Sequence, residues 1–386
     1  MIKRAIEKLI LKYLEKFPII TLTGVRQCGK STLLKGLLKK YTYVSLEDPD
    51  IRDFAEFAPR DFLEKYNSHC IFDEVQRVPN LFSYIQTKID NKNEMGQYVL
   101  SGSHNFNLMK NISQSLAGRT AVLTLTPFSI SELDSEKLLP DKLEKILYNG
   151  FYPPIYDRKI NPQDYFPSYL DTYIERDVRL LQNISNATTF KRFIKLLAIH
   201  SGQPINYTEL SNESGVSVPT VKSWISILIQ SYLIYELPPY YKNISKRLVK
   251  SPKIYFYDTG LLCHLLGIEN EKNLRLNDKF GYIFETMVIS EFKKNKLFNG
   301  KNADGYFYRD TNQLEVDLLD ERGRDLFAYE IKAAEVIDRK YFKNLLKVSE
   351  ILEIPKSHLM CIYSGINTIK NSEYNFANYK NAFTEI

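Results

Sequence analysis

The chain has 386 residues, of which 44% are hydrophobic and 25% charged, so it can bury a sizeable core. It contains no run of 18 apolar residues, which predicts no transmembrane helix and no membrane partner. Four scattered cysteines without metal-ligand spacing indicate reduced thiols, so we expect a cytoplasmic protein. The formal net charge of +6 permits a nucleic-acid partner but does not by itself predict one.

The first predicted elements flank a glycine-rich loop. PIITLT, residues 18–23, predicts a buried strand, and the leucines of TLLKGLL follow at helical spacing. Between them lies GVRQCGKS, residues 24–31, with the spacing of a Walker A motif. Loop N–H groups would bind phosphate, Lys30 would bind the β- and γ-phosphates, and Ser31 would hold Mg²⁺. The residues predicted to contact the nucleotide are Gly24, Val25, Arg26, Gln27, Cys28, Gly29, Lys30, Ser31 and Thr32. A glycine-rich turn without a ligand is the alternative.

The second motif is an apolar strand that ends in two acids, within HCIFDEVQRVP, residues 69–79. Behind a Walker A motif, this pattern predicts that Asp73 lies near Mg²⁺ as the Walker B acid. Glu74 would then orient or deprotonate the attacking water. The alternative is a solvated strand end, in which neither acid takes part in catalysis.

Three further residues are candidates for sensing the γ-phosphate. QYVLSGSHNF, residues 97–106, predicts an apolar strand with a polar end, where Ser103 and Asn105 would contact the attacking water. A simple strand-to-loop turn explains the same residues. Arg119 stands between a predicted helix and the strand AVLTL, so it would serve a neighbouring subunit as an arginine finger. The alternative is an arginine that caps the C-terminal end of that helix.

Five segments, taken in order, resemble a known family: GVRQCGKSTLL, FDEVQRVPNLFSYIQTKID, VLSGSHNFNLM, SLAGR and YIERDVRLL. They are similar to prokaryotic AAA+ ATPases of the origin-recognition and STAND-like branch, whose members carry a winged helix and a C-terminal domain of unknown function similar to restriction-type nucleases. The resemblance implies an α/β fold with a P-loop core, a parallel five-stranded sheet over about residues 15–130, and ATP with Mg²⁺. It also implies a helical lid with Arg176 or Arg179 as second sensor, although both arginines could instead pair with acids on the helix surface.

The middle of the chain predicts a helix-turn-helix. Residues 134–162 contain several prolines and predict a boundary zone, followed by helical sequence to about residue 200. NYTELSNESGVSVPTVKSWISILIQ then predicts two helices joined at Gly215, and with the next strand it resembles a winged helix. Its outer helix face has a single cation, but the following stretch has five: Lys242, Lys246, Arg247, Lys250 and Lys253. This stretch would contact DNA phosphates, or it would dock another protein domain.

The last third predicts apolar strands interrupted by isolated charges. A helix carrying Glu285 precedes the strands LEVDLLD, with Asp317, and LFAYEIKA, with Glu330 and Lys332. Residues 330 and 332 share a face because side chains alternate along a strand. The pattern resembles the PD-(D/E)XK nuclease arrangement, which implies Mg²⁺ bound by the three acids, with the lysine positioning water or stabilising the phosphate. The alternative is a buried ionic cluster in a domain without turnover.

The sequence therefore predicts four parts: an AAA+ P-loop ATPase core over residues 1–133, a helical lid over 134–200, a winged helix over 201–265, and a restriction-nuclease-like α/β domain over 266–386. We interpret the chain as an ATP-binding, ATP-hydrolysing switch that couples nucleotide state to the last two parts, with DNA as a candidate partner. The alternatives are an ATP-gated, Mg²⁺-dependent DNA nuclease and a nucleotide-bound interaction module without turnover. A homo-oligomer or another protein is a further candidate partner.

Overall fold

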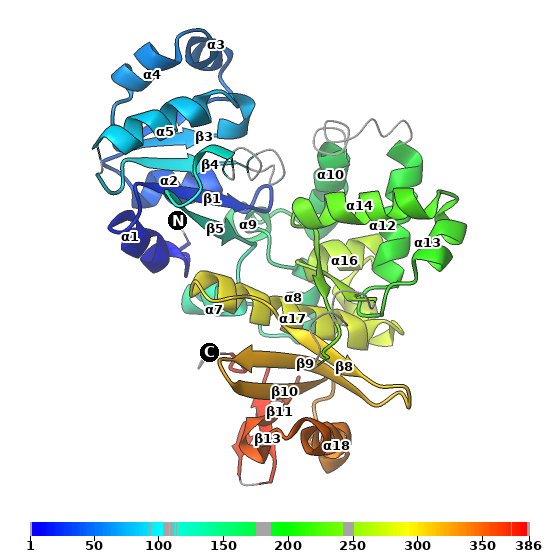
Figure 1. Ribbon diagram of the computed structural model, residues 1–386. Helices are drawn as coiled ribbons and strands as arrows, with labels where there is room; N and C mark the ends of the chain where they lie inside the picture. Colours follow the sequence, from blue (N-terminus) through cyan, green and yellow to red (C-terminus); the bar gives the residue numbers. More distant parts are fainter. Residues whose placement is uncertain are drawn as a thin grey trace. The chain divides into compact units, whose positions relative to one another are not determined.

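The protein divides into two compact units in a computed structural model that describes residues 2–92, 94–102, 108, 112, 114–174, 187–241, 251–371 and 373–383 (Figure 1). The N-terminal unit consists of Met1–Phe128 with the short segments Gln230–Tyr232 and Leu297–Lys301. The C-terminal unit consists of Ser129–Ile229, Leu233–Lys296 and Asn302–Ile386. Among the described residues, no helix has the length and apolar character that crossing a membrane requires.

The N-terminal unit is built on a five-stranded sheet with the order β2-β3-β4-β1-β5 (Figure 1). Its strands are β1 (Ile19–Gly24), β2 (Thr42–Ser45), β3 (Cys70–Asp73), β4 (Tyr98–Ser101) and β5 (Thr120–Leu125). Every pair of neighbouring strands is parallel. All six residues of β1 are buried, as expected for an inner strand of a parallel sheet. The parallel core that the family resemblance implies is therefore confirmed.

Aromatic packing in the N-terminal unit fixes the position of β3. The helices of this unit are α1 (Glu7–Leu14), α2 (Lys30–Leu37), α3 (Pro49–Phe57), α4 (Pro59–Lys65) and α5 (Leu81–Lys92), with a 3-10 turn η1 (Val75–Arg77). The ring of Phe62 on α4 lies 5.4 Å from that of Phe72 on β3, which in turn stacks 5.3 Å from the ring of Tyr98 on β4. Such pairs add about 0.5–1.5 kcal/mol each beyond the area they bury. These ring contacts stabilise the position of β3, which ends at Asp73.

Gly24, the last residue of β1, has no room for a side chain. Its φ is 136°, and a Cβ would lie 1.9 Å from the carbonyl oxygen of Leu125 on β5. We expect Gly24→Ala to lower the free energy of unfolding by at least about 3 kcal/mol, because β1 and β5 would have to move apart. Gly118→Ala is the matched control. Its φ is 76° with no atom within 4 Å of a Cβ, so only the backbone conformation costs energy, about 1 kcal/mol. Urea denaturation measures both losses, and equal losses would contradict the close approach at Gly24.

The first part of the C-terminal unit is helical. Its helices are α7 (Ile130–Ser135), α8 (Leu143–Asn149), α9 (Pro153–Asp157), α10 (Pro162–Tyr173) and α12 (Ala187–Ile199). Two of them, α8 and α9, lie in the region 134–162, which the prolines predicted as a boundary zone. Pro153 and Pro162 occupy the first turns of α9 and α10, where no backbone N–H is needed. The helical lid over residues 134–200 stays a prediction.

The predicted helix-turn-helix is present as α13 (Tyr207–Ser214) and α14 (Val218–Gln230). Gly215 ends α13 in the left-handed conformation, at φ 74°, as predicted for the turn. Two antiparallel strands follow, β6 (Ile234–Leu237) and β7 (Lys253–Phe256), and then α16 (Thr259–Leu265) and the 3-10 helix η3 (Glu271–Leu276). This order is the one that the winged-helix prediction requires, but the winged helix itself stays a prediction.

The last part of the C-terminal unit is a six-stranded mixed sheet with the order β12-β13-β11-β10-β9-β8 (Figure 1). The strands are β8 (Tyr306–Arg309), β9 (Glu315–Arg322), β10 (Asp325–Lys332), β11 (Leu359–Tyr363), β12 (Ile369–Lys370) and β13 (Asn375–Asn378). The helices are α17 (Phe280–Phe298) and α18 (Phe342–Leu352), with 3-10 turns η4 (Arg339–Tyr341) and η5 (Lys356–His358). Phe342, Leu345 and Val348 of α18 join the core of this sheet. The predicted helix that carries Glu285 and the two predicted strands that carry Asp317 and Glu330 are confirmed.

Candidate functional site

The loop after β1 has the backbone of a phosphate-binding loop. Gly24 ends the strand, residues 25–29 form the loop, and α2 begins at Lys30. Three of its residues have positive φ: Gly24 at 136°, Gln27 at 58° and Gly29 at 92°. Left-handed residues placed among right-handed ones can turn backbone N–H groups toward one side, and the N-terminus of a helix adds further N–H donors. The predicted contact residues thus form one continuous loop and first helical turn.

The side chain of Lys30 lies inside this loop. The residue is 7% exposed, and its ammonium donates to the carbonyl oxygens of Gly24, at 3.0 Å, and Val25, at 2.9 Å. An ammonium has three N–H donors, so two loop carbonyls leave one for a phosphate oxygen. The cation is held at the position where the loop would surround an anion.

Asp73 gathers three hydroxyl groups at the carboxyl end of the sheet. Its carboxylate accepts hydrogen bonds from Ser31 at 2.6 Å, from Tyr43 at 2.5 Å and from Ser101 at 2.5 Å. The structure therefore brings Ser31 and Asp73 together, as the two predicted Mg²⁺ residues must be. Burial, and next the bond to Asp73, raises the pKa of Tyr43 well above its usual range, so its hydroxyl stays a donor.

Glu74 is held by a neighbour that the sequence did not single out. Glu74 has a left-handed backbone, at φ 54°, and its carboxylate accepts a hydrogen bond of 2.6 Å from the side-chain amide of Gln76. A Cβ on Gly102, just after β4, would lie 2.1 Å from Oε1 of Gln76. Gln76 is therefore packed between the end of β4 and the predicted catalytic carboxylate, where it can position Glu74.

Arg4 is a second residue that the sequence analysis missed. Arg4 is 4% exposed. Its guanidinium donates a hydrogen bond of 2.9 Å to the carbonyl oxygen of Cys28 and one of 2.7 Å to the carbonyl oxygen of Thr126. The same group lies 4.7 Å from the centroid of the Phe128 ring. Arg4 thus connects the glycine-rich loop to the end of β5. The surrounding amphipathic sequence gave no signal for this, because a charge in such a pattern is expected to face solvent.

Arg119 lies at the amino-terminal ends of β1 and β5, whereas the glycine-rich loop follows the carboxyl-terminal end of β1. Arg119 directly precedes β5, and its carbonyl oxygen accepts from the N–H of Ile19, the first residue of β1. The six residues of β1 separate it from the loop by roughly 17 Å at ~3.3 Å per residue. Its guanidinium binds Asp90 of α5 through two bonds, of 2.6 and 2.9 Å, and the Ala117 carbonyl at 3.2 Å. Arg119 is thus too far to act on the loop of its own chain, and both predicted roles stay open.

Several predicted residues lie outside the described part of the chain: Ser103, Asn105, Arg176, Arg179, Lys242, Lys246, Arg247 and Lys250. Lys253, the last cation of the predicted DNA-contacting stretch, is described and is 2% exposed. Its ammonium lies 2.7 Å from Glu315 and 3.3 Å from Glu285. A nucleic-acid backbone cannot reach a cation buried in this way, so its assignment to a DNA contact is corrected.

The predicted acids of the C-terminal unit lie together. We call Glu285, Glu315, Asp317 and Glu330 with Lys253 and Lys332 the acidic cluster. The antiparallel strands β9 and β10 are neighbours, and their last paired residues are Leu318 and Tyr329. Asp317 and Glu330 come directly after this pair, so they lie opposite each other on the two strands. Lys332 lies 2.6 Å from Glu330 and 4.0 Å from Asp317. The predicted arrangement on adjacent strands is present, and a metal role for it stays a prediction.

Burial changes the protonation of two acids in the cluster. Burial, reinforced by the charge of Asp317, raises the pKa of Glu330 to about 8. Burial also raises the pKa of Glu285 to about 7, although Lys253 opposes this shift. Four carboxylates face two ammonium groups, so the cluster carries excess negative charge when every group is ionised.

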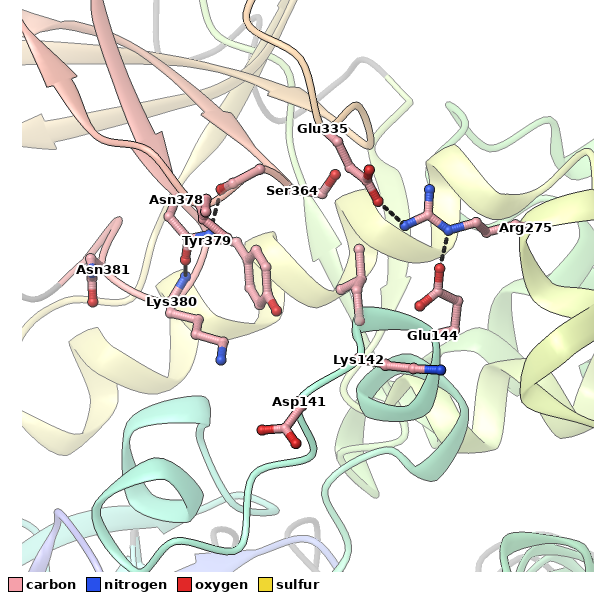
Figure 2. A pocket seen from close by; sticks show the side chains of 13 residues that line it. Asp141, Lys142, Glu144, Arg275, Glu335, Ser364, Asn378, Tyr379, Lys380 and Asn381 are labelled. Carbon is pink, nitrogen blue, oxygen red and sulfur yellow. Dashed lines mark hydrogen bonds and ion pairs between the residues drawn. The ribbon is translucent and has the colours of Figure 1, made fainter.

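A separate cavity of about 650 Å³ lies within the C-terminal unit (Figure 2). Arg275 of η3 is hydrogen-bonded there to both Glu144 of α8 and Glu335, which follows β10. None of the residues that line this cavity belongs to the predicted nucleotide site or to the acidic cluster. The lining contains three cations, Lys142, Arg275 and Lys380, and three acids, Asp141, Glu144 and Glu335, so it has no net charge that would favour an anionic ligand.

Three family models match consecutive parts of the chain. An AAA domain matches residues 16–134, and two domains of unknown function, DUF8612 and DUF4143, match residues 140–272 and 280–381. An uncharacterized protein of Mycobacterium tuberculosis is 29% identical over 322 residues, which cover 83% of this chain and 71% of the relative. An uncharacterized protein of Haemophilus influenzae is 23% identical over 279 residues, covering 64% and 69%.

Two solved structures are similar at low identity. The Walker-type ATPase of Pyrococcus abyssi has a TM-score of 0.46 and 13% identity, and the similarity covers 69% of this chain and 96% of that chain. AMPPCP-bound DnaA of Aquifex aeolicus has a TM-score of 0.31 and 16% identity, covering 58% and 86%. The segment that matches the AAA domain, residues 16–134, contains the whole parallel five-stranded sheet and the glycine-rich loop after β1, so this part of the chain is similar to an AAA domain.

Proposed function

We propose that the N-terminal unit binds ATP with Mg²⁺ and hydrolyses it. The observation that carries the proposal is the hydrogen bond of 2.6 Å between Ser31 and Asp73. It joins the helix that follows the glycine-rich loop to the acid that ends β3, beside the buried ammonium of Lys30. A loop that served only as a turn would need neither the buried cation nor the acid.

The residues beside Lys30 fit a magnesium ion. Mg²⁺ prefers hard oxygen ligands, and the Ser31 hydroxyl and the Asp73 carboxylate already lie within hydrogen-bond distance of each other. When bound, Mg²⁺ would neutralise charge on the β- and γ-phosphates. Lys30 would bind the same phosphates, and the loop N–H groups would orient them.

Glu74 would act on the attacking water. The water oxygen bonds to the γ-phosphorus, the bond from this phosphorus to the β–γ bridging oxygen breaks, and the water proton passes to the Glu74 carboxylate. The hydrogen bond from Gln76 would keep that carboxylate in place. The products are ADP and phosphate, and proton release from Glu74 to solvent completes the cycle.

The wider proposal is a switch in which nucleotide state acts on the C-terminal unit through a helical lid, a winged helix and a nuclease-like domain. The order of helices and strands from α10 to β13 supports this division. DNA remains the candidate partner. An ATP-gated nuclease remains the alternative function, and Mg²⁺-dependent nicking of plasmid DNA tests it. Phosphate release from ATP tests the ATPase itself, since an interaction module without turnover would bind ATP and release none.

Arg119 provides a test for action between subunits. If it serves a neighbour's γ-phosphate, turnover per chain should rise with protein concentration. Arg119→Ala should then bind ATP normally and lose this rise. Phosphate release, measured over a wide range of protein concentrations, provides the comparison.

Asp90→Ala is the matched control for Arg119→Ala, because it removes the same exposed ion pair and keeps the guanidinium. The finger role predicts that Asp90→Ala retains the concentration-dependent rise. If both variants behave alike, or if wild-type turnover does not depend on concentration, Arg119 has a structural role only.

A further inference from the structure

The acidic cluster contains a cation that the sequence analysis did not place there. Lys253 is the first residue of β7, and its ammonium lies 2.7 Å from Oε1 of Glu315 on β9 and 3.3 Å from Oε1 of Glu285 on α17. Tyr255, two residues further along β7, donates its hydroxyl to the same oxygen of Glu285 at 2.6 Å. Side chains two apart on a strand share a face, so β7 presents both an ammonium and a hydroxyl to these carboxylates.

The other half of the cluster is occupied by N–H donors from β10. Lys332 lies 2.6 Å from Oε1 of Glu330. Oδ2 of Asp317 accepts the backbone N–H of Ile331 at 2.7 Å and lies 4.0 Å from the Lys332 ammonium. Among the described residues, Oε2 of Glu330 is the one carboxylate oxygen of the cluster that is buried without a hydrogen-bond partner.

These residues do not fit the divalent metal that the nuclease resemblance implies. Mg²⁺ needs about six oxygen ligands at ~2.1 Å, which must converge on one point. Within the part of the chain that the structure describes, only His200, Glu209 and Glu213 form a set of acidic, histidine or cysteine ligand atoms that all lie within 4.8 Å of one another. They lie at the end of α12 and on α13, outside the acidic cluster. A divalent ion in the cluster would also lie beside two fixed positive charges.

Carboxylates surround the buried ammonium of Lys253, with Glu315 at 2.7 Å and Glu285 at 3.3 Å. A charged ammonium with 2% exposure persists only because carboxylates surround it. The same carboxylates would be left without their counter-ion if this side chain were absent.

We infer that Lys253 is the resident cation of the acidic cluster: its ammonium lies against Glu285, one of the three acids that the nuclease resemblance assigns to the metal, and against Glu315, so the cluster excludes Mg²⁺ and Mn²⁺ while β7 is in place. The second strand after the predicted helix-turn-helix, β7, therefore decides whether the nuclease-like acids can bind a metal. This inference goes beyond the ATPase, and its test uses nucleotide-free protein, so its failure would leave the ATPase proposal standing.

Mn²⁺ binding to four variants of the full chain tests the inference, with free Mn²⁺ measured by electron paramagnetic resonance. In the wild-type background, Asp317→Asn should leave the number and affinity of Mn²⁺ sites unchanged. Lys253→Met, which nearly keeps the length of the side chain and removes its charge, should gain one Mn²⁺ per chain that the wild-type protein does not bind. Adding Asp317→Asn to Lys253→Met should abolish the gained site.

Lys296→Met is the matched control, because Lys296 is another buried lysine with a carboxylate partner, Asp320, at 2.7 Å. Among the described residues, Asp320 is the one carboxylate in an ion pair with its ammonium, so this variant should gain no site. The inference is overturned if the wild-type protein binds a Mn²⁺ ion and Asp317→Asn abolishes this binding. This test does not depend on whether Lys253→Met folds. It is equally overturned if Lys253→Met is folded, as shown by a wild-type circular dichroism spectrum, and gains no Mn²⁺ site.

Discussion

Lys30→Ala is expected to abolish ATP binding. The ammonium of Lys30 is 7% exposed and is held inside the glycine-rich loop by the carbonyls of Gly24 and Val25. In the proposed function this cation binds the β- and γ-phosphates, and alanine removes the charge without replacing its hydrogen bonds. We expect the affinity for ATP to fall at least about 100-fold, which corresponds to about 2.8 kcal/mol. Isothermal titration calorimetry with Mg²⁺ measures this loss.

Lys35→Ala provides the control, since Lys35 is on the same helix and its ammonium lies over the ring of Tyr43 rather than in the loop. This variant should bind ATP with wild-type affinity. Circular dichroism establishes that both variants are folded. Unchanged ATP affinity in folded Lys30→Ala would contradict the assignment of the loop as a phosphate site.

Glu74→Gln is expected to separate binding from hydrolysis. The substitution keeps the size of the side chain and its ability to accept from Gln76, but it removes the base. A general base contributes about 10²–10⁴-fold to a rate, so we expect turnover to fall by about this factor. Affinity for ATP should remain within about twofold of wild type, because Glu74 does not contact the phosphates in this account.

The matched control is Glu56→Gln, which changes an exposed glutamate of α3 in the same unit. It should have wild-type turnover. Wild-type turnover in Glu74→Gln would remove Glu74 from the mechanism. A parallel loss of ATP affinity would instead mean that Glu74 supports the structure of the loop.

The candidate nucleotide site could be predicted because its main signals are local in the sequence. The glycines, Lys30 and Ser31 lie in one loop, and Asp73 directly ends an apolar strand. Tyr43 and Ser101 were not predicted as its partners, because their contact with Asp73 depends on strand order. In the register of β3 with β4, Asp73 lies opposite Ser101. The sequence alone does not state that β2 and β4 flank β3.

Sequence patterns wrongly predicted that two buried charged residues would face solvent or DNA. Arg4 lies in a charged, amphipathic stretch, and its burial depends on carbonyl groups 24 and 122 residues further along the chain. Lys253 ends a run of cations, which predicts a solvated or DNA-facing stretch, and its partner Glu285 lies 32 residues later. A local pattern cannot report contacts of this range, whereas the fold of the sheet around Asp317 and Glu330 followed from strand alternation.

Phosphate release from ATP by the purified full chain, with Mg²⁺ and across a range of protein concentrations, tests the central claim most directly. The account predicts many turnovers per chain for wild type. It predicts almost no release by Glu74→Gln, which still binds ATP, and none by Lys30→Ala. Release by wild type at the same level as Lys30→Ala, from protein that binds ATP, would contradict the claim that this AAA-type domain is an active ATPase.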